Sequence, residues 1–406
     1  MNNSSDSKTQ ELMEKLREEE RRRRLLFEQV QELRGAIRVI CRIRPDISQG
    51  WLKYEMKNGE FHANPAKLIV IEENKTPWGE IKPAKPDTYE FERIFGPQET
   101  NAAIFGEISG FIQSVIDGKK ACVFCYGQSG TGKTYTMSNL DNLQDRKEGF
   151  HYENDGIIHR VKTMIFKEKE RLEELDFAMT VAGCCYEIYD NKLWLLKVGG
   201  REEKSISRTT RSVENPELKT LNSNSDFNAM VGIGMKNRHF GTTKLNDNSS
   251  RSHFIISVET RVISKDTSKV LRQGLLNLID LAGAERTRQA STAGLEFQEG
   301  RNINTSLSHL ARVFISLSEG KKPTYNGNIL TEFLQCSLER GCMTLMFLMI
   351  SLLKDNWPAT KQTLQFALDA QSAKKTEPSN RGTKATPARP LPSNPPTAGQ
   401  KPWTRK

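Results

Sequence analysis

The chain has 406 residues, which is enough for one large or two ordinary domains with full hydrophobic cores. Hydrophobic residues make up 36% of it and charged residues 27%, and no apolar run approaches the roughly 18 residues of a membrane span. The first residues, MNNSSDSKTQ, lack the basic and then apolar layout of a signal peptide. These features exclude the membrane-spanning class and favour a soluble protein.

The seven cysteines are an odd number with no regular spacing, which favours reduced thiols in a cytosolic or nuclear setting over a disulfide framework. Two close pairs, Cys122 with Cys125 and Cys184 with Cys185, are compatible with a metal or redox site. Both pairs fall in apolar, strand-like runs. We therefore predict buried core thiols at all four positions.

Residues 1–35 are predicted to form a coiled-coil neck helix. Its seam steps by alternating four and three residues. The seam positions are Leu12, Leu16, Glu19, Arg23, Leu26, Val30 and Leu33. Two of them are charged, so a single charged helix is the alternative. Gly35 ends the helix just before AIRVICRIRP, a strand-like run, and a helix joined by one glycine to a strand can act as a lever.

Residues 36–372 alternate β-like runs with helical stretches such as 103–117 and 302–319. The β-like runs are KLIVIEE, ACVFCYG, FAMTVAGCCYEIY, SHFIISVETRVI and GLLNLIDLAG. This alternation predicts one α/β domain whose central, mixed β-sheet is flanked by helices on both faces. No internal repeat is visible.

GQSGTGKT, from Gly127 to Thr134, fits the pattern G-x-x-x-x-G-K-[ST]. In that pattern the glycines let backbone N–H groups converge on phosphate oxygens. Lys133 would reach the β- and γ-phosphates, and Thr134 would hold Mg²⁺. A chance glycine-rich turn is the alternative, but the preceding ACVFCY supplies the buried strand that a phosphate-binding loop (P-loop) requires. We therefore predict a nucleotide site.

Two later segments carry the chemistry that such a site needs. NDNSSRSH, from Asn246 to His253, brings together hydroxyls, an arginine and amides, which can sense a γ-phosphate and order water around Mg²⁺. In LIDLAGAER, Asp280 ends an apolar strand, where a P-loop enzyme holds its Mg²⁺ shell, and Gly283 can donate a backbone N–H to the γ-phosphate. Either segment alone could be a polar loop; together with the P-loop they predict a phosphate-driven machine.

Residues 373–406 are rich in Pro, Ser and Thr, with almost no aliphatic side chains. Such a segment cannot offset its ordering entropy, so we predict a disordered tail. From Lys374 onward it holds eight Lys and Arg against one Glu, which accounts for most of the net charge of +10. Attraction to an acidic surface and a simple solubilising role remain equal alternatives.

GQSGTGKTYTM, NDNSSRSH and DLAGAE resemble the P-loop, switch I and switch II of the kinesin motor domain. CRIRP, YEIYDN and NINTSLSHL resemble further kinesin segments, and the similarity covers roughly residues 36–372. The order of helix and motor, with LRGAIRVICRIRP at the junction, resembles the C-terminal-motor (kinesin-14) class, whose members walk toward microtubule minus ends. The resemblance implies a P-loop NTPase fold of the kinesin-motor type and ATP as the nucleotide.

The resemblance also assigns residues to the nucleotide. Arg42, Arg44, Pro45 and Tyr135 would frame the adenine by stacking and apolar contact. The loop would wrap the phosphates. Its assigned residues are Gln128, Ser129, Gly130, Thr131, Gly132, Lys133 and Thr134.

Hydrolysis is assigned to the two switches and to Mg²⁺. Thr134 and Ser250 would complete the metal's shell, and Asp280 would hold its waters. Ser249 and Asn246 would position the attacking water.

A salt bridge between Arg251 and Glu285 would close the switches around ATP, with Gly283 beside the γ-phosphate. Loss of phosphate would then release the switches, and that movement is the output.

Several positions depart from the kinesin pattern. Ala284 stands where kinesins usually carry serine, and Ala36 stands where the C-terminal-motor class usually carries asparagine. In KKPTYNGNILTEFLQ, Asn326 and Ile329 replace the two cations of a typical H-V-P-Y-R-N-S-K-L-T run, and Thr305 stands where a lysine is usual.

Tubulin's surface is acidic, so each lost cation weakens a salt-screened attraction to the microtubule. Nearby cations could compensate or could be ordinary solvated charges. They are Arg301, Arg312, Lys321, Lys322 and Arg340.

Two functions follow. One is a microtubule-stimulated motor ATPase, minus-end directed as the kinesin-14 resemblance implies, whose neck helix moves as ATP is hydrolysed. The other is a nucleotide-switch module that binds microtubules weakly, as a crosslinker or one half of a heterodimer. Either would act in the cytoplasm on microtubules or the spindle, as a homo- or heterodimer, with no nucleic acid or membrane partner. A GTPase is disfavoured because the N-K-x-D guanine motif is absent.

Overall fold

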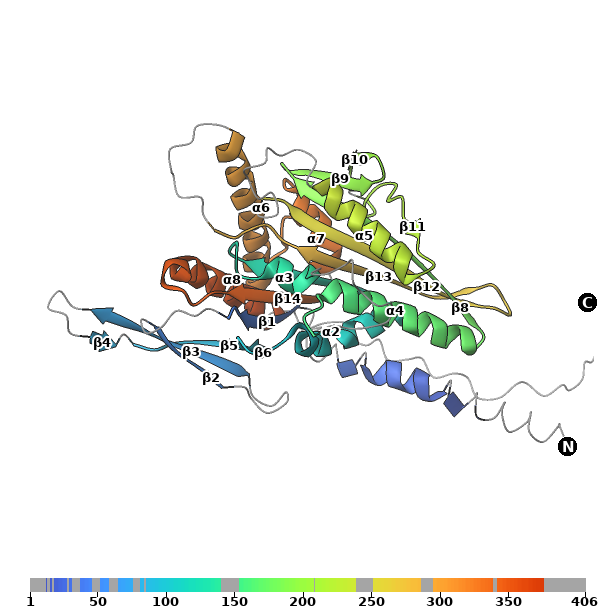
Figure 1. Ribbon diagram of the computed structural model, residues 1–406, viewed down its shortest axis with the longest axis horizontal. Coiled ribbons are helices and arrows are strands. Elements are labelled where there is room, and N and C mark those ends of the chain that lie inside the picture. Colours follow the sequence, from blue (N-terminus) through green and yellow to red (C-terminus); the bar gives the residue numbers. More distant parts are fainter. Residues whose placement is uncertain are drawn as a thin grey trace, which may run out of the picture.

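The computed structural model describes residues 12, 15–16, 18–27, 29–30, 37–45, 52–57, 65–75, 81–83, 85–139, 153–207, 209–238, 251–285, 295–338 and 342–375. A large mixed sheet forms its centre (Figure 1). In spatial order the strands are β10 (Gly200–Lys204), β9 (Lys192–Lys197), β8 (Phe177–Tyr189), β12 (His253–Ser264), β13 (Val270–Asp280), β7 (Lys120–Gly127), β14 (Cys342–Ile350), β1 (Ile37–Ile43) and β6 (Arg93–Phe95), while β11 (Lys219–Thr220) pairs with β8.

The sheet is parallel from β13 through β7, β14 and β1 to β6, and antiparallel from β13 through β12, β8 and β9 to β10. The parallel strands have helices over both faces, so every residue of β1 and nearly every residue of β7 is buried. Burial on both faces explains why ACVFCYG is a nearly unbroken apolar run and why IRVICRI is apolar apart from the buried Arg38 and Arg42. The predicted mixed sheet is confirmed.

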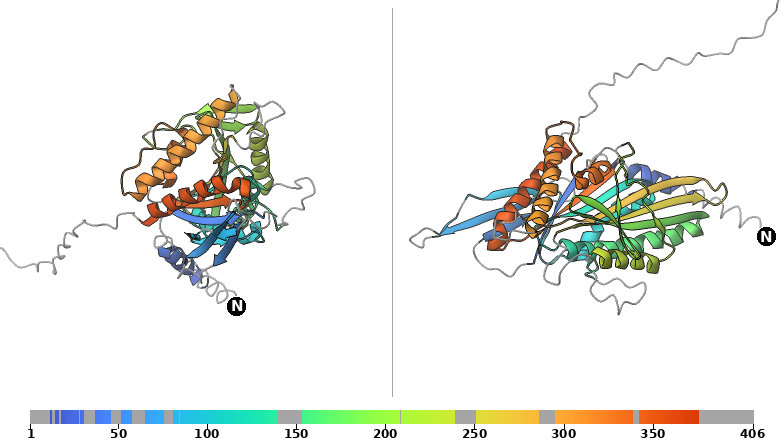
Figure 2. Two further views of the ribbon diagram at one scale, coloured as in Figure 1. Left: turned by 90° about the vertical axis from the view of Figure 1, so that its left-hand side faces the viewer. Right: turned by 90° about the horizontal axis from the view of Figure 1, so that it is seen from above.

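Helices cover both faces of the sheet (Figure 2). The helices α2 (Asn101–Ile116), α4 (Ile157–Glu174) and α5 (Asn224–Arg238) bury one apolar cluster, and α6 (Leu295–Ser318), α7 (Ile329–Leu338) and α8 (Trp357–Lys375) bury the other. A short helix, α3 (Lys133–Ser138), follows β7, and a 3₁₀ turn, η3 (Lys354–Asn356), precedes α8. The stretches predicted to be helical at 103–117 and 302–319 correspond to α2 and α6.

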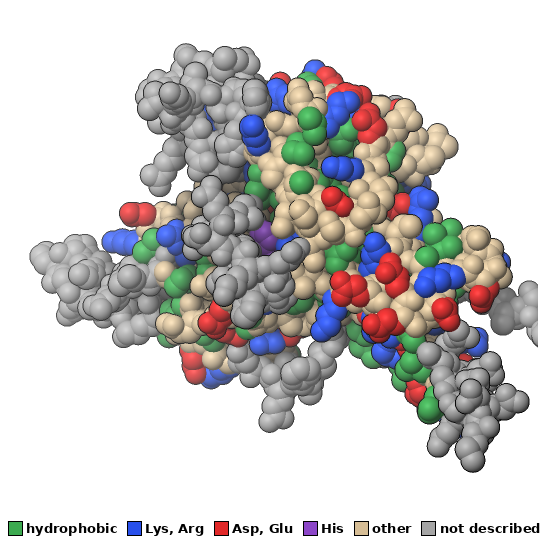
Figure 3. All heavy atoms as spheres, turned by 45° about the vertical axis from the view of Figure 1, so that its right-hand side comes forward, with side chains coloured by type: hydrophobic (Ala, Val, Ile, Leu, Met, Phe, Trp, Pro, Cys, Tyr) green, Lys and Arg blue, Asp and Glu red, His purple; other side chains and the backbone are tan. Residues whose placement is uncertain are grey.

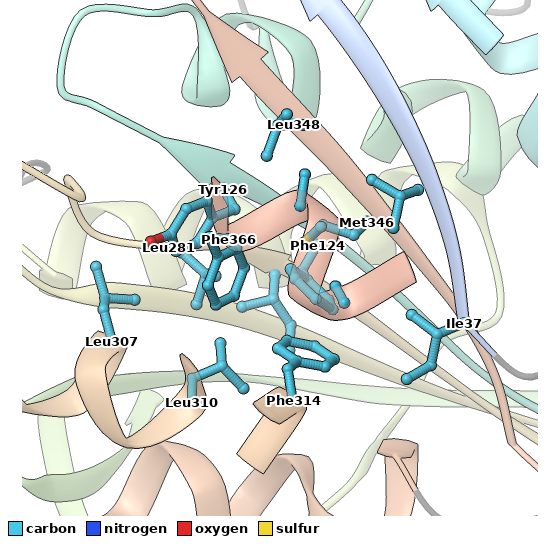
Figure 4. Close-up of a cluster of buried hydrophobic side chains, with 14 of the residues drawn as sticks. Ile37, Phe124, Tyr126, Leu281, Leu307, Leu310, Phe314, Met346, Leu348 and Phe366 are labelled. Atoms are coloured by element: carbon cyan, nitrogen blue, oxygen red, sulfur yellow. The ribbon is translucent and has the colours of Figure 1, made fainter. Parts of the chain in front are cut away.

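The cluster under α6 and α8 is built around aromatic contacts (Figure 4). Phe366 of α8 stacks on Tyr126 of β7, with ring centroids 3.9 Å apart, and Phe314 of α6 meets Phe366 edge-on at 5.3 Å. The edge-to-face arrangement of Phe314 and Phe366 is one that aromatic pairs favour. The two contacts hold α8 over the strand that leads into the P-loop.

A smaller antiparallel sheet projects from the main body (Figure 1). Its central strand, β3 (Ala66–Lys75), pairs with β2 (Leu52–Lys57), β4 (Ile81–Pro83) and β5 (Asp87–Phe91). The predicted strand KLIVIEE therefore lies in this separate sheet and not in the central one. Its alternating burial, with Leu68 and Val70 inside, is the pattern of a sheet that covers the core with one face.

The described residues between 12 and 30 form an N-terminal helix that lies along α2 and α4 (Figure 1). Arg23 Nη2 lies 3.1 Å from Asp117 Oδ2, and Arg171 Nη1 donates to Glu20 Oε1 at 2.6 Å. Four apolar seam residues are 43–60% exposed: Leu12, Leu16, Leu26 and Val30. The described residues here are helical and the seam residue Arg23 contacts Asp117 at the end of α2, while the neck coiled coil over residues 1–35 stays a prediction. Residues 31–36 lie outside the described part, and with them Leu33, Gly35 and Ala36.

Three smaller predictions can also be compared with the structure. Helix α8 continues to Lys375, three residues into the segment predicted as the tail; residues 376–406 are not among those described, so the tail stays a prediction. Burial of the thiols is confirmed at Cys122, Cys125, Cys184 and Cys185. Within the described ranges no helix is long and apolar enough to cross a membrane, and no group of three or more acidic, thiol or imidazole side chains could hold a metal ion.

The face in Figure 3 mixes positive and negative side chains.

Candidate nucleotide site

The P-loop lies where β7 ends and α3 begins, as predicted from the strand before it. Gly127 pairs with Met349 of β14, and a Cβ on Gly127 would lie 2.2 Å from the Met349 carbonyl oxygen. Gly130 and Gly132 have φ of 78° and 96°, in the left-handed region that favours glycine. The sequence G-x-x-x-x-G is therefore dictated by a close backbone approach at its start and a left-handed turn at its end.

Lys133 is folded into its own loop. Its Nζ donates to the carbonyl oxygens of Gly127 and Gln128, both at 2.9 Å, and the residue is only 7% exposed. Burial lowers the pKa of the ammonium, while Asp280 and Glu285 act to raise it. The structure thus places a cation, neighboured by two carboxylates, where phosphate oxygens would lie over the loop.

Thr134 and Asp280 meet across the site. Thr134 Oγ1 donates to Asp280 Oδ2 at 2.7 Å, and Asp280, at the end of β13, is 2% exposed. Strand β13 pairs with β7 in parallel, which brings the end of one strand beside the loop that follows the other. Asp280 Oδ1 is buried and has no hydrogen-bond partner among the described residues. A hydroxyl beside an unsatisfied carboxylate oxygen is the donor set that Mg²⁺ prefers.

Glu285 fastens the segment after β13 to the P-loop. Its Oε2 accepts from Ser129 N at 2.7 Å and its Oε1 from Ser129 Oγ at 2.5 Å. Ala284 N donates to Gly127 O at 3.0 Å. A Cβ on Gly283 would lie 2.2 Å from Ser129 Oγ and 2.3 Å from Glu285 Oε2. Only glycine at 283 therefore allows this contact between the two segments.

The structure describes one of the four predicted residues of the first switch. Arg251 lies two residues before β12, while Asn246, Ser249 and Ser250 lie outside the described residues. Both Glu285 oxygens accept bonds from Ser129, and its salt bridge with Arg251 stays a prediction.

On the side predicted to hold the base, the four candidates divide into two kinds. The Arg42 guanidinium is buried, donates to Asn101 Oδ1 at 2.6 Å and to Thr136 Oγ1 at 2.5 Å, and lies 5.6 Å from the Tyr135 ring. Arg42 therefore links β1 to α2 and α3 and packs against Tyr135. Arg44, which donates to Gly130 O, and Pro45 are exposed, and Tyr135 is 40% exposed. These three remain the candidates for contact with a base.

Sequence reasoning missed two residues that contact the end of β13 or the segment directly after it. Arg238, at the end of α5, is 7% exposed, with Nη1 3.7 Å from Asp280 Oδ2 and Nη2 donating to Ser252 O at 2.9 Å. It belongs to no motif in the sequence, so only the fold could reveal it.

The second, His253, does belong to NDNSSRSH. Ala282 N donates to its Nδ1 at 3.0 Å, and its Nε2 lies 3.0 Å from Ser306 Oγ. Burial, aided by the charges of Arg238 and Lys133, lowers the pKa of His253 to about 3. A neutral imidazole therefore joins the segment after β13 to α6.

The positions where the kinesin pattern has cations and this chain does not lie in or near α6 and α7. Asn326 and Thr305 are exposed, and Ile329 is half-buried. Of the cations named as substitutes, Arg312, Lys321 and Lys322 are exposed, and Lys321 Nζ lies 2.7 Å from Glu319 Oε2. The side chains of Arg301 and Arg340 are not among those described.

Comparison with known proteins identifies the family. The family model described as "Kinesin motor domain" matches residues 42–373. Kinesin-like protein klpA of Emericella nidulans is 35% identical over 386 residues, which cover 89% of this chain and 47% of that protein. Kinesin-like protein KIN-14K of Arabidopsis thaliana is 35% identical over 362 residues, covering 86% of this chain and 33% of that protein. The chain thus spans less than half the length of these relatives.

Solved structures agree. The C-terminal motor and motor homology domain of Kar3Vik1, fused to a synthetic heterodimeric coiled coil, superposes with a TM-score of 0.74 at 31% identity, covering 91% of this chain and 93% of that one. The motor domain of Kar3 from Saccharomyces cerevisiae superposes with a TM-score of 0.68 at 28% identity, covering 83% and 100%. Together with the P-loop, Asp280 and Glu285 in contact, these matches place the chain in the kinesin motor-domain family, beside relatives of the kinesin-14 class.

Proposed function

We propose that this chain is the motor of a microtubule-stimulated ATPase that hydrolyses ATP and moves its neck helix toward the microtubule minus end. The observation that carries the proposal is the convergence of separated segments on the P-loop: Asp280 on Thr134, and Glu285 on Ser129. Because these contacts join the P-loop to the end of β13 and to the segment after it, a change at the terminal phosphate can be transmitted to that segment.

Each residue of the predicted nucleotide site has a separate task in this proposal. Lys133 moves from its loop carbonyls to the β- and γ-phosphates and offsets their charge. Tyr135, Arg44 and Pro45 hold the adenine, with Arg42 as support. Gly283 offers its N–H beside the γ-phosphate, and Arg251 pairs with Glu285 when the site closes.

The metal and the attacking water complete the site. Thr134 and Asp280 fit Mg²⁺ because Asp280 Oδ1 is a buried acceptor with an unmet hydrogen-bonding capacity in the described structure. Ser250 would add a hydroxyl ligand, and Ser249 and Asn246 would orient water. When bound, Mg²⁺ neutralises charge on the phosphates. The chain itself supplies placement and charge stabilisation, which account for most catalysis of phosphoryl transfer.

The second candidate is a nucleotide-switch module that binds microtubules weakly, as a crosslinker or one half of a heterodimer. The exposed Asn326 and Thr305 favour it, because neither carries the positive charge that an acidic tubulin surface attracts. The four exposed apolar seam residues of the N-terminal helix are available to a second helix in either case, so we propose a homo- or heterodimer. We further propose action on cytoplasmic or spindle microtubules.

ATP turnover measured with and without microtubules, across a salt series, tests both candidates. We expect Mg²⁺-dependent basal turnover, stimulation by microtubules at low salt, and loss of that stimulation as salt rises. Turnover that microtubules do not stimulate at any salt concentration would favour the switch module. The absence of both ATP turnover and ADP binding would refute both candidate functions. Gliding of polarity-marked microtubules tests direction, since plus-end-directed movement would contradict the minus-end assignment.

A further inference from the structure

One side chain of the P-loop, that of Gln128, contacts a residue directly before helix α8. Gln128 Nε2 donates to Asn356 Oδ1 at 3.2 Å, although the two residues are 228 positions apart. Asn356 is the last residue of η3, directly before α8. The P-loop is therefore joined to the start of the C-terminal helix by a contact that involves neither switch.

The orientation of the Asn356 amide is fixed by a hydrogen bond to Ser351. Its Nδ2 donates to Ser351 Oγ at 3.0 Å, and its backbone N donates to Leu353 O at 3.0 Å. Ser351 is fully buried, and its carbonyl oxygen accepts from Thr360 Oγ1 of α8 at 2.7 Å. Because Nδ2 is used on Ser351, the oxygen of the amide is the atom that faces Gln128.

Gln128 also holds the residues of the loop that face the phosphates. Its backbone carbonyl accepts from Lys133 Nζ at 2.9 Å and from Thr131 Oγ1 at 2.7 Å. Its side-chain Oε1 is buried, with no hydrogen-bond partner in the described structure. The bond to Asn356 is thus the one hydrogen bond that this side-chain amide makes within the described residues, and losing it would leave the whole amide without a partner there.

Helix α8 cannot easily follow a shift of this contact. Phe366 is stacked on Tyr126, two residues before Gln128, with ring centroids 3.9 Å apart. The strand and the helix therefore form one packed unit, and the Gln128–Asn356 bond closes the space between their ends.

We propose that Asn356 is a positioning residue for the nucleotide site: through Gln128 it sets the turn of the P-loop that presents Lys133, and so governs how long ADP is retained. The inference rests on the proposed function only in taking ADP as the bound nucleotide. It adds a contact from η3 that belongs to neither switch and to none of the residues assigned above to catalysis.

A double-mutant cycle on Gln128 and Asn356 tests the proposal, with the release of a fluorescent ADP analogue as the readout. We expect Asn356→Ala and Gln128→Met each to speed release by about threefold to tenfold, the effect of losing one hydrogen bond. The double variant should release no faster than the faster single variant, because both substitutions break the same bond. The KM for ATP should rise with kcat less affected.

Two further variants separate positioning from simple destabilisation. Asn356→Asp keeps an oxygen toward Gln128, and its second oxygen can accept from the Ser351 hydroxyl, so release should stay within about twofold of the unmodified chain. Asp355→Asn is the matched control: Asp355 is exposed in the same η3 turn, and we expect unchanged release.

Three results would overturn the proposal: unchanged release in Gln128→Met, multiplicative effects in the double variant, or equal effects of Asn356→Ala and Asn356→Asp. Gln128→Met decides the question even if Asn356→Ala does not fold, because Met has a similar shape and leaves α8 untouched. If the unmodified chain bound no ADP analogue, the proposed function would fail instead, and the two failures are therefore distinguishable.

Discussion

Two regions differ in whether their functional side chains also hold the backbone in place. One is the nucleotide edge of the sheet, around the P-loop and the end of β13, and the other is the turn that leads into α7. At the nucleotide edge, the residues that match the kinesin pattern contact one another, as Thr134 does Asp280 and Ser129 does Glu285. In the turn before α7, two cations of the pattern are replaced by Asn326 and Ile329. The turn is nonetheless well formed.

The turn is held by groups other than those replaced. Tyr325 is buried and its carbonyl oxygen accepts from Thr331 Oγ1 at 2.6 Å. Asn328 Oδ1 accepts from Leu330 N at 3.0 Å and so caps the first turn of α7. Buried and capping groups fix the backbone here, so the surface charge can change without changing the fold. At the nucleotide edge the functional side chains are themselves the structural contacts.

The first way to break this comparison is Lys133→Ala. We expect ATP turnover to fall by about 10³-fold or more, because a buried cation that offsets phosphate charge is lost. Steady-state phosphate release measures the effect. Lys321→Ala is the control, because Lys321 is exposed and pairs with Glu319, which is not part of the nucleotide site. The basal turnover of this variant should not change. Undiminished turnover in Lys133→Ala would end the assignment of the site.

A smaller effect is expected from Gly283→Ala. The new methyl group would lie within 2.4 Å of both Glu285 oxygens and Ser129 Oγ, so it should separate Glu285 from Ser129. We expect turnover to fall by about 10²-fold, as when one stabilising donor is lost. Because the displaced atoms end flexible side chains, thermal unfolding should shift little. A variant that turns over normally would show that the Ser129–Glu285 contact is unnecessary.

Much of the nucleotide edge could be predicted because its signals are local. A buried strand followed by G-x-x-x-x-G-K-T specifies a strand, a left-handed turn and a helix within one short segment. Asp280 could be predicted in the same way, from its place at the end of an apolar strand.

Contacts between distant segments could not be predicted. Nothing in the sequence around Arg238 indicates that the end of α5 packs against Asp280, and nothing around Asn356 indicates its bond to Gln128. KLIVIEE has the composition of a central strand, yet its place in the smaller sheet depends on which strands it pairs with. Such pairings are decided by the packing of the whole domain, which no local pattern encodes.

The comparison is sharpened by restoring charge to the turn before α7. Asn326→Arg places a cation at an exposed position, and we expect microtubule affinity at low salt to rise by a few-fold, with a steeper fall as salt increases. Cosedimentation across a salt series measures it. Ala229→Arg on α5, which packs on the opposite face of the sheet, adds the same charge as a control. Equal gains from both variants would indicate a nonspecific effect of net charge.

Ile329→Lys restores the second cation at a cost to the fold. Ile329 is half-buried against the core, so removing its apolar contacts should lower the free energy of unfolding by about 1 kcal/mol. The lysine stem can still cover part of this surface while its ammonium reaches solvent. We therefore expect a gain in affinity similar to that of Asn326→Arg, together with a lower unfolding midpoint that Asn326→Arg does not show.

The smallest expected effect concerns pH and His253, which lies between the two regions by joining Ala282 to Ser306 of α6. Its pKa is about 3 in the folded chain and 6.5 when unperturbed, so above pH 6.5 both states are neutral and its contribution to stability is complete. As pH falls below 6.5, the unfolded chain binds a proton that the folded chain does not. At pH 6.0 this should lower the free energy of unfolding by about 0.8 kcal/mol.

Urea unfolding at pH 7.5 and 6.0 measures this loss, with His253→Asn for comparison. Asn keeps an acceptor for Ala282 N but does not titrate, and all other groups titrate alike in both chains, so the difference between their pH dependences isolates His253. Identical pH dependence would mean that His253 is protonated as readily in the folded as in the unfolded chain. That result would contradict its burial near Arg238 and Lys133, because a third positive charge there would need compensation that the surrounding hydrogen bonds do not supply.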